Sequence, residues 1–186
     1  NPEVMKFVSN RMLADKSIEI DTLQEAKGIS IAEELLKFPF VKSIYLSANF
    51  ISISKTKELE WEDIAMQLRV FIADHLNENQ IKNYTEHFIA KDIDSEKTSD
   101  SKKAKIREFN DEEKEIEKIL DQYIKPAVAS DGGEISLNYY KDNIVYVDLK
   151  GACSGCPSST STLKGGIENL LKQKINPDIQ VIANET

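Results

Sequence analysis

A charged stretch in the middle of this 186-residue chain limits its fold more than any other feature. Residues 77–110 carry seven acidic and seven basic side chains, and within 92–105 only Ile93 and Ala104 are apolar. So few apolar side chains cannot offset the entropy that is lost when a segment becomes ordered. We therefore predict a flexible linker at 77–110, mobile at least over 92–105, which joins two domains at 1–76 and 111–186.

The first domain is expected to combine a small sheet with helices. The apolar pattern predicts strands near 4–8 and 18–20, a helix from Ser30 to just before Pro39, strands at 41–46 and 50–54, and a helix from Trp61 to about Leu76. Ser30 and Glu33 have the spacing of a capping box. In the turn Ala48-Asn49, asparagine is expected to supply the left-handed geometry. Ile81, Tyr84 and Phe88 predict a short further helix beyond this domain.

The second domain is expected to have the order helix, strand, strand, helix, strand. The predicted elements are a helix over 116–123 that stops near Pro126, strands at 134–140 and 143–149, a helix through Leu163–Leu171, and a strand at 179–182. The sequence Asp131-Gly132-Gly133 predicts a turn with unusual backbone angles before the first strand. The fold class that follows is α+β, with two small α+β domains joined by the linker.

Composition excludes several classes of partner. The net charge of −8 argues against nucleic acid and against anionic membrane surfaces. No apolar run approaches the roughly 20 residues that a membrane-spanning helix needs. Two neighbouring cysteines do not make the disulfide framework of a secreted protein, so we expect a cytoplasmic location. The sequence shows no signal peptide, and because it opens on Asn1 rather than Met, removal of a leader stays open.

The candidate site is a pair of cysteines in the loop Gly151-Ala152-Cys153-Ser154-Gly155-Cys156-Pro157. Cys153 and Cys156 are the only cysteines, and a Cys-x-x-Cys pair supplies half of a four-thiolate site. The loop runs into a predicted helix start, where N–H groups and the helix dipole stabilise thiolates. The hydroxyls of Ser158, Ser159 and Thr160 add donors near the sulfurs, and proline suits the first helical position.

Four kinds of site compete for this pair. An internal zinc site is disfavoured, because the only histidines, His75 and His87, lie far upstream. A structural disulfide is disfavoured by a reducing compartment. A redox dithiol is open, although an antiparallel hairpin rather than a βαβ unit precedes the loop. A 4Fe–4S cluster shared by two copies across a two-fold axis would supply four thiolates. The residues alone do not decide between the last two.

Three motifs in the second half resemble the C-terminal domain of the Nfu/NifU iron–sulfur proteins. They are residues 126–133 (PAVASDGG), 151–159 (GACSGCPSS) and 162–168 (TLKGGIE), in the family's order and spacing over about 111–183. The first half resembles the Nfu N-terminal domain more loosely, through Asn1-Pro2, Lys6-Phe7, the strand Val41–Tyr45, residues 50–55 and Trp61. Additional cluster-assembly domains of the longer NifU proteins have no counterpart in this sequence.

The resemblance implies a scaffold or carrier of iron–sulfur clusters rather than an enzyme. Cys153 and Cys156 carry over as the ligands of a 4Fe–4S cluster that bridges a homodimer. The cluster would come from an upstream scaffold and pass to apo iron–sulfur acceptor proteins by thiolate exchange. Two ligands per chain in an exposed loop are expected to make the cluster labile. A CxxC dithiol oxidoreductase of thioredoxin-like activity is the alternative, and a zinc-bridged structural dimer is a weaker one.

Two glycine pairs near the site have competing interpretations. Gly165-Gly166 lies inside a predicted helix, where each glycine costs about 1 kcal/mol relative to alanine. This pair either lets a second subunit or the cluster approach the helix, or packs against the sheet of the same chain. The pair Gly132-Gly133 is interpreted as a structural turn that positions the following hairpin, in preference to a direct cluster contact. Lys164, which could attract an anionic cluster, is interpreted as a solvated side chain.

Overall fold

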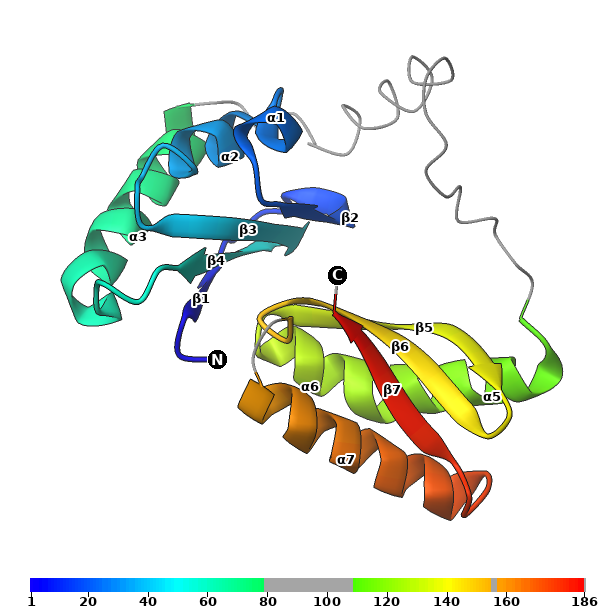
Figure 1. The fold of residues 1–186 in the computed structure, drawn as a ribbon. Coiled ribbons are helices and arrows are strands. Elements are labelled where there is room, and N and C mark those ends of the chain that lie inside the picture. Colours follow the sequence, from blue (N-terminus) through cyan, green and yellow to red (C-terminus); the bar gives the residue numbers. More distant parts are fainter. Residues whose placement is uncertain (79–108, 155–156, 186) are drawn as a thin grey trace. The chain divides into compact units, whose positions relative to one another are not determined.

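The computed structural model describes residues 1–78, 109–154 and 157–185. The chain divides into two compact units with the boundary between residues 101 and 102, and each unit is considered by itself (Figure 1). The predicted mobile stretch at 92–105 and the short helix predicted at Ile81, Tyr84 and Phe88 lie outside the described residues. No helix in the described ranges is both long enough and apolar enough to span a membrane.

The N-terminal domain is a four-stranded antiparallel sheet with helices packed on one face (Figure 1). The strand order is β1-β4-β3-β2, with β1 (Val4–Val8), β2 (Ala14–Ile20), β3 (Val41–Ala48) and β4 (Phe50–Lys55). The helices are α1 (Leu23–Ala26), α2 (Ser30–Leu35) and α3 (Trp61–Glu78). Apolar side chains from both layers form one core, among them Ile44, Ile53, Leu35, Leu68 and Ile72. The predicted mixture of sheet and helices is confirmed.

The capping box that we predicted at Ser30 and Glu33 is wrong. The N-cap of α2 is Ile29, with no side-chain cap, and the hydroxyl of Ser30 instead lies 3.0 Å from His75 Nε2 on α3. The carboxylate of Glu33 accepts a hydrogen bond from the Gly28 N–H at 2.8 Å. A capping box does occur one helix earlier, between Thr22 and Glu25 at the start of α1.

The turn between β3 and β4 also differs from the prediction. Ala48, not Asn49, takes the left-handed backbone, with φ of 46°. Asn49 uses its side-chain amide instead, donating to the carbonyl of Ser9 at 3.1 Å. The Leu13 N–H donates to the Ala48 carbonyl at 2.6 Å, so contacts with the segment between β1 and β2 set this turn.

The C-terminal domain is a three-stranded mixed sheet with helices on one face (Figure 1). Its elements in sequence order are α5 (Asp111–Ile119), η1 (Leu120–Ile124), α6 (Lys125–Ser130), β5 (Gly133–Lys141), β6 (Ile144–Gly151), α7 (Pro157–Lys174) and β7 (Gln180–Glu185). β5 and β6 form an antiparallel hairpin, and β7 lies parallel to β6 on its other side. The core includes Ile116, Leu120, Val147, Ile167 and Leu171. The predicted order of elements, and with it the α+β fold, is confirmed.

The first helical segment of this domain does not stop at Pro126 as we predicted. A turn of π-helix, η1, connects α5 to α6, and Pro126 lies in the first turn of α6. Proline donates no backbone hydrogen bond, and a wider turn just before it lets the helix continue. Lys125 reinforces this join, because its Nζ lies 2.7 Å from Glu117 Oε1 and 2.5 Å from Asp121 Oδ1. Burial alone would lower the pKa of Lys125, but these two partners outweigh it and raise the pKa.

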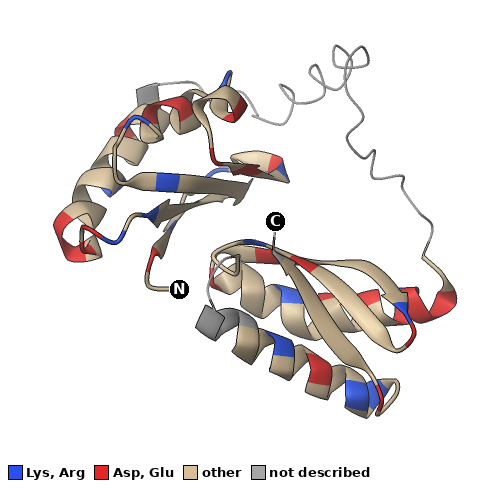
Figure 2. Ribbon diagram, viewed as in Figure 1, with Lys and Arg blue, Asp and Glu red and all other residues tan. Residues whose placement is uncertain are grey.

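A buried carboxylate fastens α5 to the sheet. Glu113 has no solvent-exposed surface, and its two oxygens accept the backbone N–H groups of Asn110 at 3.0 Å and Tyr140 at 2.9 Å. The first contact completes a capping box with Asn110, and the second reaches β5. Acidic residues also dominate the first turn of α5, and basic residues the last turn of α7 (Figure 2). Both distributions oppose the helix dipole and so stabilise the helices.

Candidate metal centre

Cys153 lies in the turn that directly follows β6. The Ser154 N–H donates to the Gly151 carbonyl at 3.0 Å, and Gly151 has a left-handed φ of 63°. The Ala152 N–H donates to the carbonyl of Gly132 at 3.2 Å, and Gly132 is also left-handed, with φ of 84°. The cysteine loop and the Asp131-Gly132-Gly133 turn therefore lie side by side, although about twenty residues separate them in the sequence.

The sulfur of Cys153 occupies the space where a side chain of residue 133 would be. A Cβ atom added to Gly133 would lie 2.8 Å from Cys153 Sγ and 2.8 Å from the Lys150 carbonyl oxygen. Both distances are shorter than real Cβ contacts, so only glycine fits without displacing its neighbours. Gly132 thus supplies the turn that we predicted, and Gly133 has a different role, because it makes room for the thiol. The sequence alone did not reveal this second role.

Cys153 is buried, with 6% of its surface exposed, and belongs to the apolar core of the domain. Our expectation of an exposed loop is wrong for this residue. The physical reason is the missing side chain at Gly133, which lets the thiol fold down beside the first residues of the β5–β6 hairpin. The sulfur is held within packed protein rather than displayed on the surface.

Helix α7 begins at Pro157, as predicted for a proline at the first helical position. An 18-residue helix therefore points its N-terminus toward the loop that carries the cysteines, and such an end favours negative charge. Cys156 lies outside the described residues, as do the side chains of Ser158, Ser159 and Thr160. The assignment of Cys153 and Cys156 as metal ligands therefore stays a prediction.

The other candidate ligands do not gather around Cys153. In the part of the chain that the structure describes, no three His, Cys, Asp or Glu side chains are placed to hold one metal ion. His75 belongs to the N-terminal domain, where its ring contacts Ser30 and stacks near Phe71. His87 lies outside the described residues.

The outer face of α7 carries the glycine pair that the sequence singled out. A Cβ atom added to Gly165 or Gly166 would meet no described atom within 4 Å outside the helix's own backbone, and both residues are exposed. Packing against the sheet of the same chain therefore does not explain either glycine. Lys164 is exposed beside them, as expected of a solvated lysine.

One turn further along α7, Glu168 connects the helix to β7. Its carboxylate accepts hydrogen bonds from Lys172 Nζ at 2.7 Å and from the Val181 N–H at 3.1 Å. These two bonds, that from Lys172 most strongly, hold the pKa of the Glu168 carboxyl below its ordinary value. The helix that follows the cysteine loop is thereby fixed against the strand that lies next to β6.

Two family models account for most of the chain. Residues 1–79 match the model described as scaffold protein Nfu/NifU N terminal, and residues 116–182 match the NifU-like domain. The chain belongs to the Nfu/NifU family. The resemblance of the second half, drawn from the cysteine loop and the glycine motifs, is confirmed, and so is the looser resemblance of the first half.

Several relatives match this Nfu/NifU-family chain along nearly its whole length. A human protein named NFU1 iron-sulfur cluster scaffold homolog, mitochondrial, is 30% identical over 97% of this chain and 66% of its own length. Its counterpart in Drosophila ananassae is 30% identical over 98% of this chain and 60% of its own length. NifU-like protein 4, mitochondrial, of Arabidopsis thaliana is 25% identical over 95% of this chain and 60% of its own length. The chain thus spans about three fifths to two thirds of the length of these relatives.

These relatives correct one expectation about location. We expected a cytoplasmic protein, but the human, fruit-fly and Arabidopsis relatives are all named as mitochondrial. The names point to mitochondria rather than the cytoplasm. The error has a simple cause, because a low cysteine count excludes a disulfide framework without distinguishing one compartment that keeps thiols reduced from another.

Proposed function

We propose that this protein carries a 4Fe–4S cluster and delivers it to apo iron–sulfur proteins, and that it does so as a binder rather than as an enzyme. The cluster is cargo, received from an upstream scaffold. Cys153 and Cys156 of one chain would provide two of the four thiolates that a cubane takes, and a second copy would provide the other two. The family membership and the scaffold proteins named among the relatives support this role.

The observation that carries the proposal is the fit between Cys153 and Gly133. The domain leaves out a side chain, Cβ included, at the point where the sulfur lies. Any side chain at residue 133 would displace this sulfur, so the glycine keeps the thiol of Cys153 at a defined place next to the start of α7. The N-terminus of α7 adds a favourable field for thiolates and for an anionic cluster.

The open face at Gly165 and Gly166 supports the shared arrangement. Neither glycine has a packing reason among the described residues of its own chain. Two glycines destabilise a helix interior by about 2 kcal/mol relative to alanines. Close approach of a second copy, or of the cluster between two copies, gives this loss of stability a function.

Delivery follows from the incomplete ligand set. Two thiolates per chain hold the cluster only while both chains are present. An acceptor that offers its own thiolates can replace them one at a time, so that each iron–sulfur bond broken is matched by one formed and no redox change is required. The burial of Cys153 favours return of its thiol to the core after the cluster leaves.

Anaerobic reconstitution with ferrous iron and sulfide tests the proposal. We expect about four irons and four sulfides per dimer, and a dimer that dissociates when the cluster is removed by a chelator. Cys153→Ser and Cys156→Ser should each abolish cluster binding, whereas Ser154→Ala, in the same loop, should leave it unchanged. A wild-type protein that stays colourless and monomeric would contradict the proposal, as would a cysteine variant that retains the cluster.

The same preparation separates the dithiol oxidoreductase alternative. That function predicts a reversible disulfide between the two cysteines and reduction of insulin disulfides by the iron-free protein. We expect no such activity above the background given by the Cys153→Ser variant. Zinc bound in place of iron after native purification would instead indicate the zinc-bridged structural dimer.

A further inference from the structure

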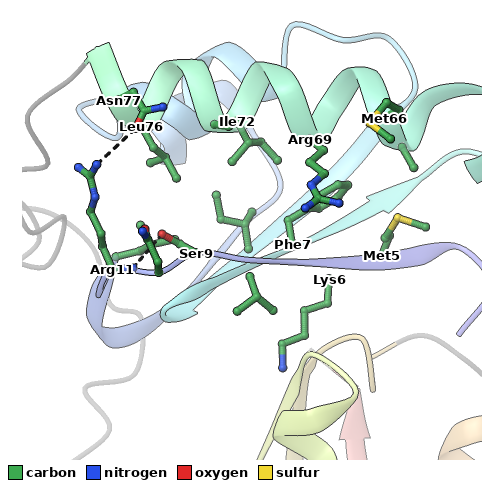
Figure 3. A pocket seen from close by; sticks show the side chains of 16 residues that line it. Met5, Lys6, Phe7, Ser9, Arg11, Met66, Arg69, Ile72, Leu76 and Asn77 are labelled. Atoms are coloured by element: carbon green, nitrogen blue, oxygen red, sulfur yellow. Dashed lines mark hydrogen bonds between the residues drawn. The ribbon is translucent and has the colours of Figure 1, made fainter.

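A groove of about 730 Å³ runs between β1 and α3 in the N-terminal domain (Figure 3). Its base is apolar, formed by Phe7 on β1, Ile51 on β4, and Ile72 and Leu76 on α3. At the start of α3, Trp61 packs edge-on against Phe7, with the ring centroids 6.4 Å apart. The groove therefore follows most of β1 and most of α3 beyond its first turn.

β1 forms one edge of the sheet and contacts a neighbouring strand on one side. Its register with β4 is fixed by hydrogen bonds from Lys55 N–H to the Glu3 carbonyl at 2.8 Å and from Ser9 N–H to the Asn49 carbonyl at 2.7 Å. In an antiparallel pair alternate residues bond to the partner strand. The backbone N–H and C=O groups of Val4 and Val8 therefore point away from β4, and among the described strands only β4 pairs with β1.

The charge of the groove is opposite to that of the chain. Its lining contains three charged side chains, Lys6, Arg11 and Arg69, and no acidic residue, although the whole chain has a net charge of −8. Lys6 points away from α3, with its Nζ 4.2 Å from the centre of the Phe50 ring (Figure 3). The two arginines extend into the space between β1 and α3 (Figure 3).

The two arginines occupy different positions along the groove. Arg69 comes from the middle of α3 and is exposed. Arg11 lies beyond the end of β1 and donates from Nη2 to Asn77 Oδ1 at 3.3 Å, near the end of α3. A ligand along β1 would therefore meet a guanidinium near its centre and another at one end. Guanidinium groups favour carboxylates, which they bind through paired hydrogen bonds.

We propose that this groove binds an extended acidic segment of a partner protein, which adds as a fifth strand to the open edge of β1. The backbone of the segment pairs with the outward groups of Val4 and Val8, and its apolar side chains pack against Phe7 on β1 and against the exposed Met66 on α3. Its carboxylates contact Arg11 and Arg69. Strand addition of this kind obtains affinity from the main chain and selectivity from side-chain pockets. The interaction requires no cluster, so it stands or falls independently of the proposed carriage.

The test uses the full, cluster-free chain labelled with 15N and a seven-residue peptide probe. The probe has three central β-branched residues flanked by two acidic residues at each end. Titration should shift the amide resonances of β1 and of α3 and leave the C-terminal domain unchanged. A peptide with lysine at the four acidic positions should bind at least tenfold more weakly. A version with N-methyl groups at alternate positions, which cannot pair with a strand, should not bind.

Variants of the protein separate charge from strand addition. Arg69→Glu and Arg11→Glu should each weaken binding of the acidic probe at least tenfold, whereas Lys42→Glu, an equal change of charge at an exposed position of β3, should not. Val8→Pro removes an outward N–H from an edge position where proline is tolerated, and should abolish binding. Equal binding of the acidic and lysine peptides, or of the N-methylated peptide, would overturn the proposal. So would a cluster-free chain that sediments as a dimer and becomes a monomer on the change Val8→Pro, because a second copy would then occupy the β1 edge.

Discussion

Replacing the two exposed glycines of α7 should stabilise the cluster-free C-terminal domain. A Cβ atom at Gly165 or Gly166 meets no described atom within 4 Å beyond the helix itself, so no clash opposes the higher helix propensity of alanine. Each change is expected to contribute about 0.8–1.0 kcal/mol. The variant with both alanines should gain about 2 kcal/mol, which corresponds to about 8–16 °C in Tm for a domain of 60–100 residues.

Scanning calorimetry of the full chain measures this gain, and the sequence provides an internal reference. Trp61 is the only tryptophan and lies in the N-terminal domain, so its fluorescence assigns the transition of that domain. That transition should not move. Asn169→Ala, on the same exposed face of α7, is the matched control and should gain less, about 0.6 kcal/mol, because asparagine is a better helix former than glycine.

A larger side chain at the same place tests whether a second copy approaches this face of α7. Gly166→Leu should leave the cluster-free monomer folded but reduce the yield of reconstituted dimer, because the new side chain occupies the approach to the face. Gln173→Leu, two turns further along the helix, should leave the yield unchanged. If the alanine variants fail to stabilise the monomer, the face at Gly165 and Gly166 is not open. If Gly166→Leu binds a full complement of cluster, no second copy approaches closely at this helix.

Three further outcomes follow from contacts described above. Gly133→Ala should destabilise the C-terminal domain by about 1–3 kcal/mol in urea denaturation, because its Cβ would lie 2.8 Å from both a sulfur and a backbone oxygen. Glu113→Ala should lower the free energy of unfolding by about 2–4 kcal/mol, because it leaves the Tyr140 N–H without its acceptor. Glu113→Gln should lower it less, and an equal loss of stability in both variants would contradict this reasoning. The folded-state pKa of Glu168 is depressed, so its stabilising contribution is present above the ordinary glutamate value of 4.5 and is lost as the pH falls through the lower, folded value. Glu168→Gln should therefore flatten the loss of stability between neutral and acid pH, measured by thermal unfolding.

The sequence predicted the elements well where apolar periodicity is local. The strands at β3 and β4, the long helix α3 and the order of the C-terminal domain all carry strong patterns of one period. The helix that was predicted to begin at Ser30 does begin there, but the predicted capping box failed because the Ser30 hydroxyl contacts His75, which is 45 residues away and on another helix. Non-local partners of this kind leave no trace in local spacing. The Thr22 and Glu25 pair had the same capping signature and was available to be found.

The candidate site was predictable in its chemistry but not in its packing. Two cysteines three positions apart, followed by a helix start, indicate a thiolate site from the sequence alone. That Cys153 is buried against Gly133 depends on how the β5–β6 hairpin joins its two ends, at Gly133 and Gly151. The continuous helix past Pro126 was also hidden, because a π turn has no distinctive composition.

The parallel pairing of β6 with β7 has a consequence for biosynthesis. Ile144 on β6 pairs with Gln180 on β7, and the cysteine loop and all of α7 lie between them in the sequence. On the ribosome the cysteines therefore emerge after the β5–β6 hairpin but before α7 and before the strand that completes their domain. Formation of this late, long-range contact is slow compared with local helix formation. Newly made chains thus have an interval in which their thiols are open to other metals or oxidants, and the pairing of β7 with β6 ends it.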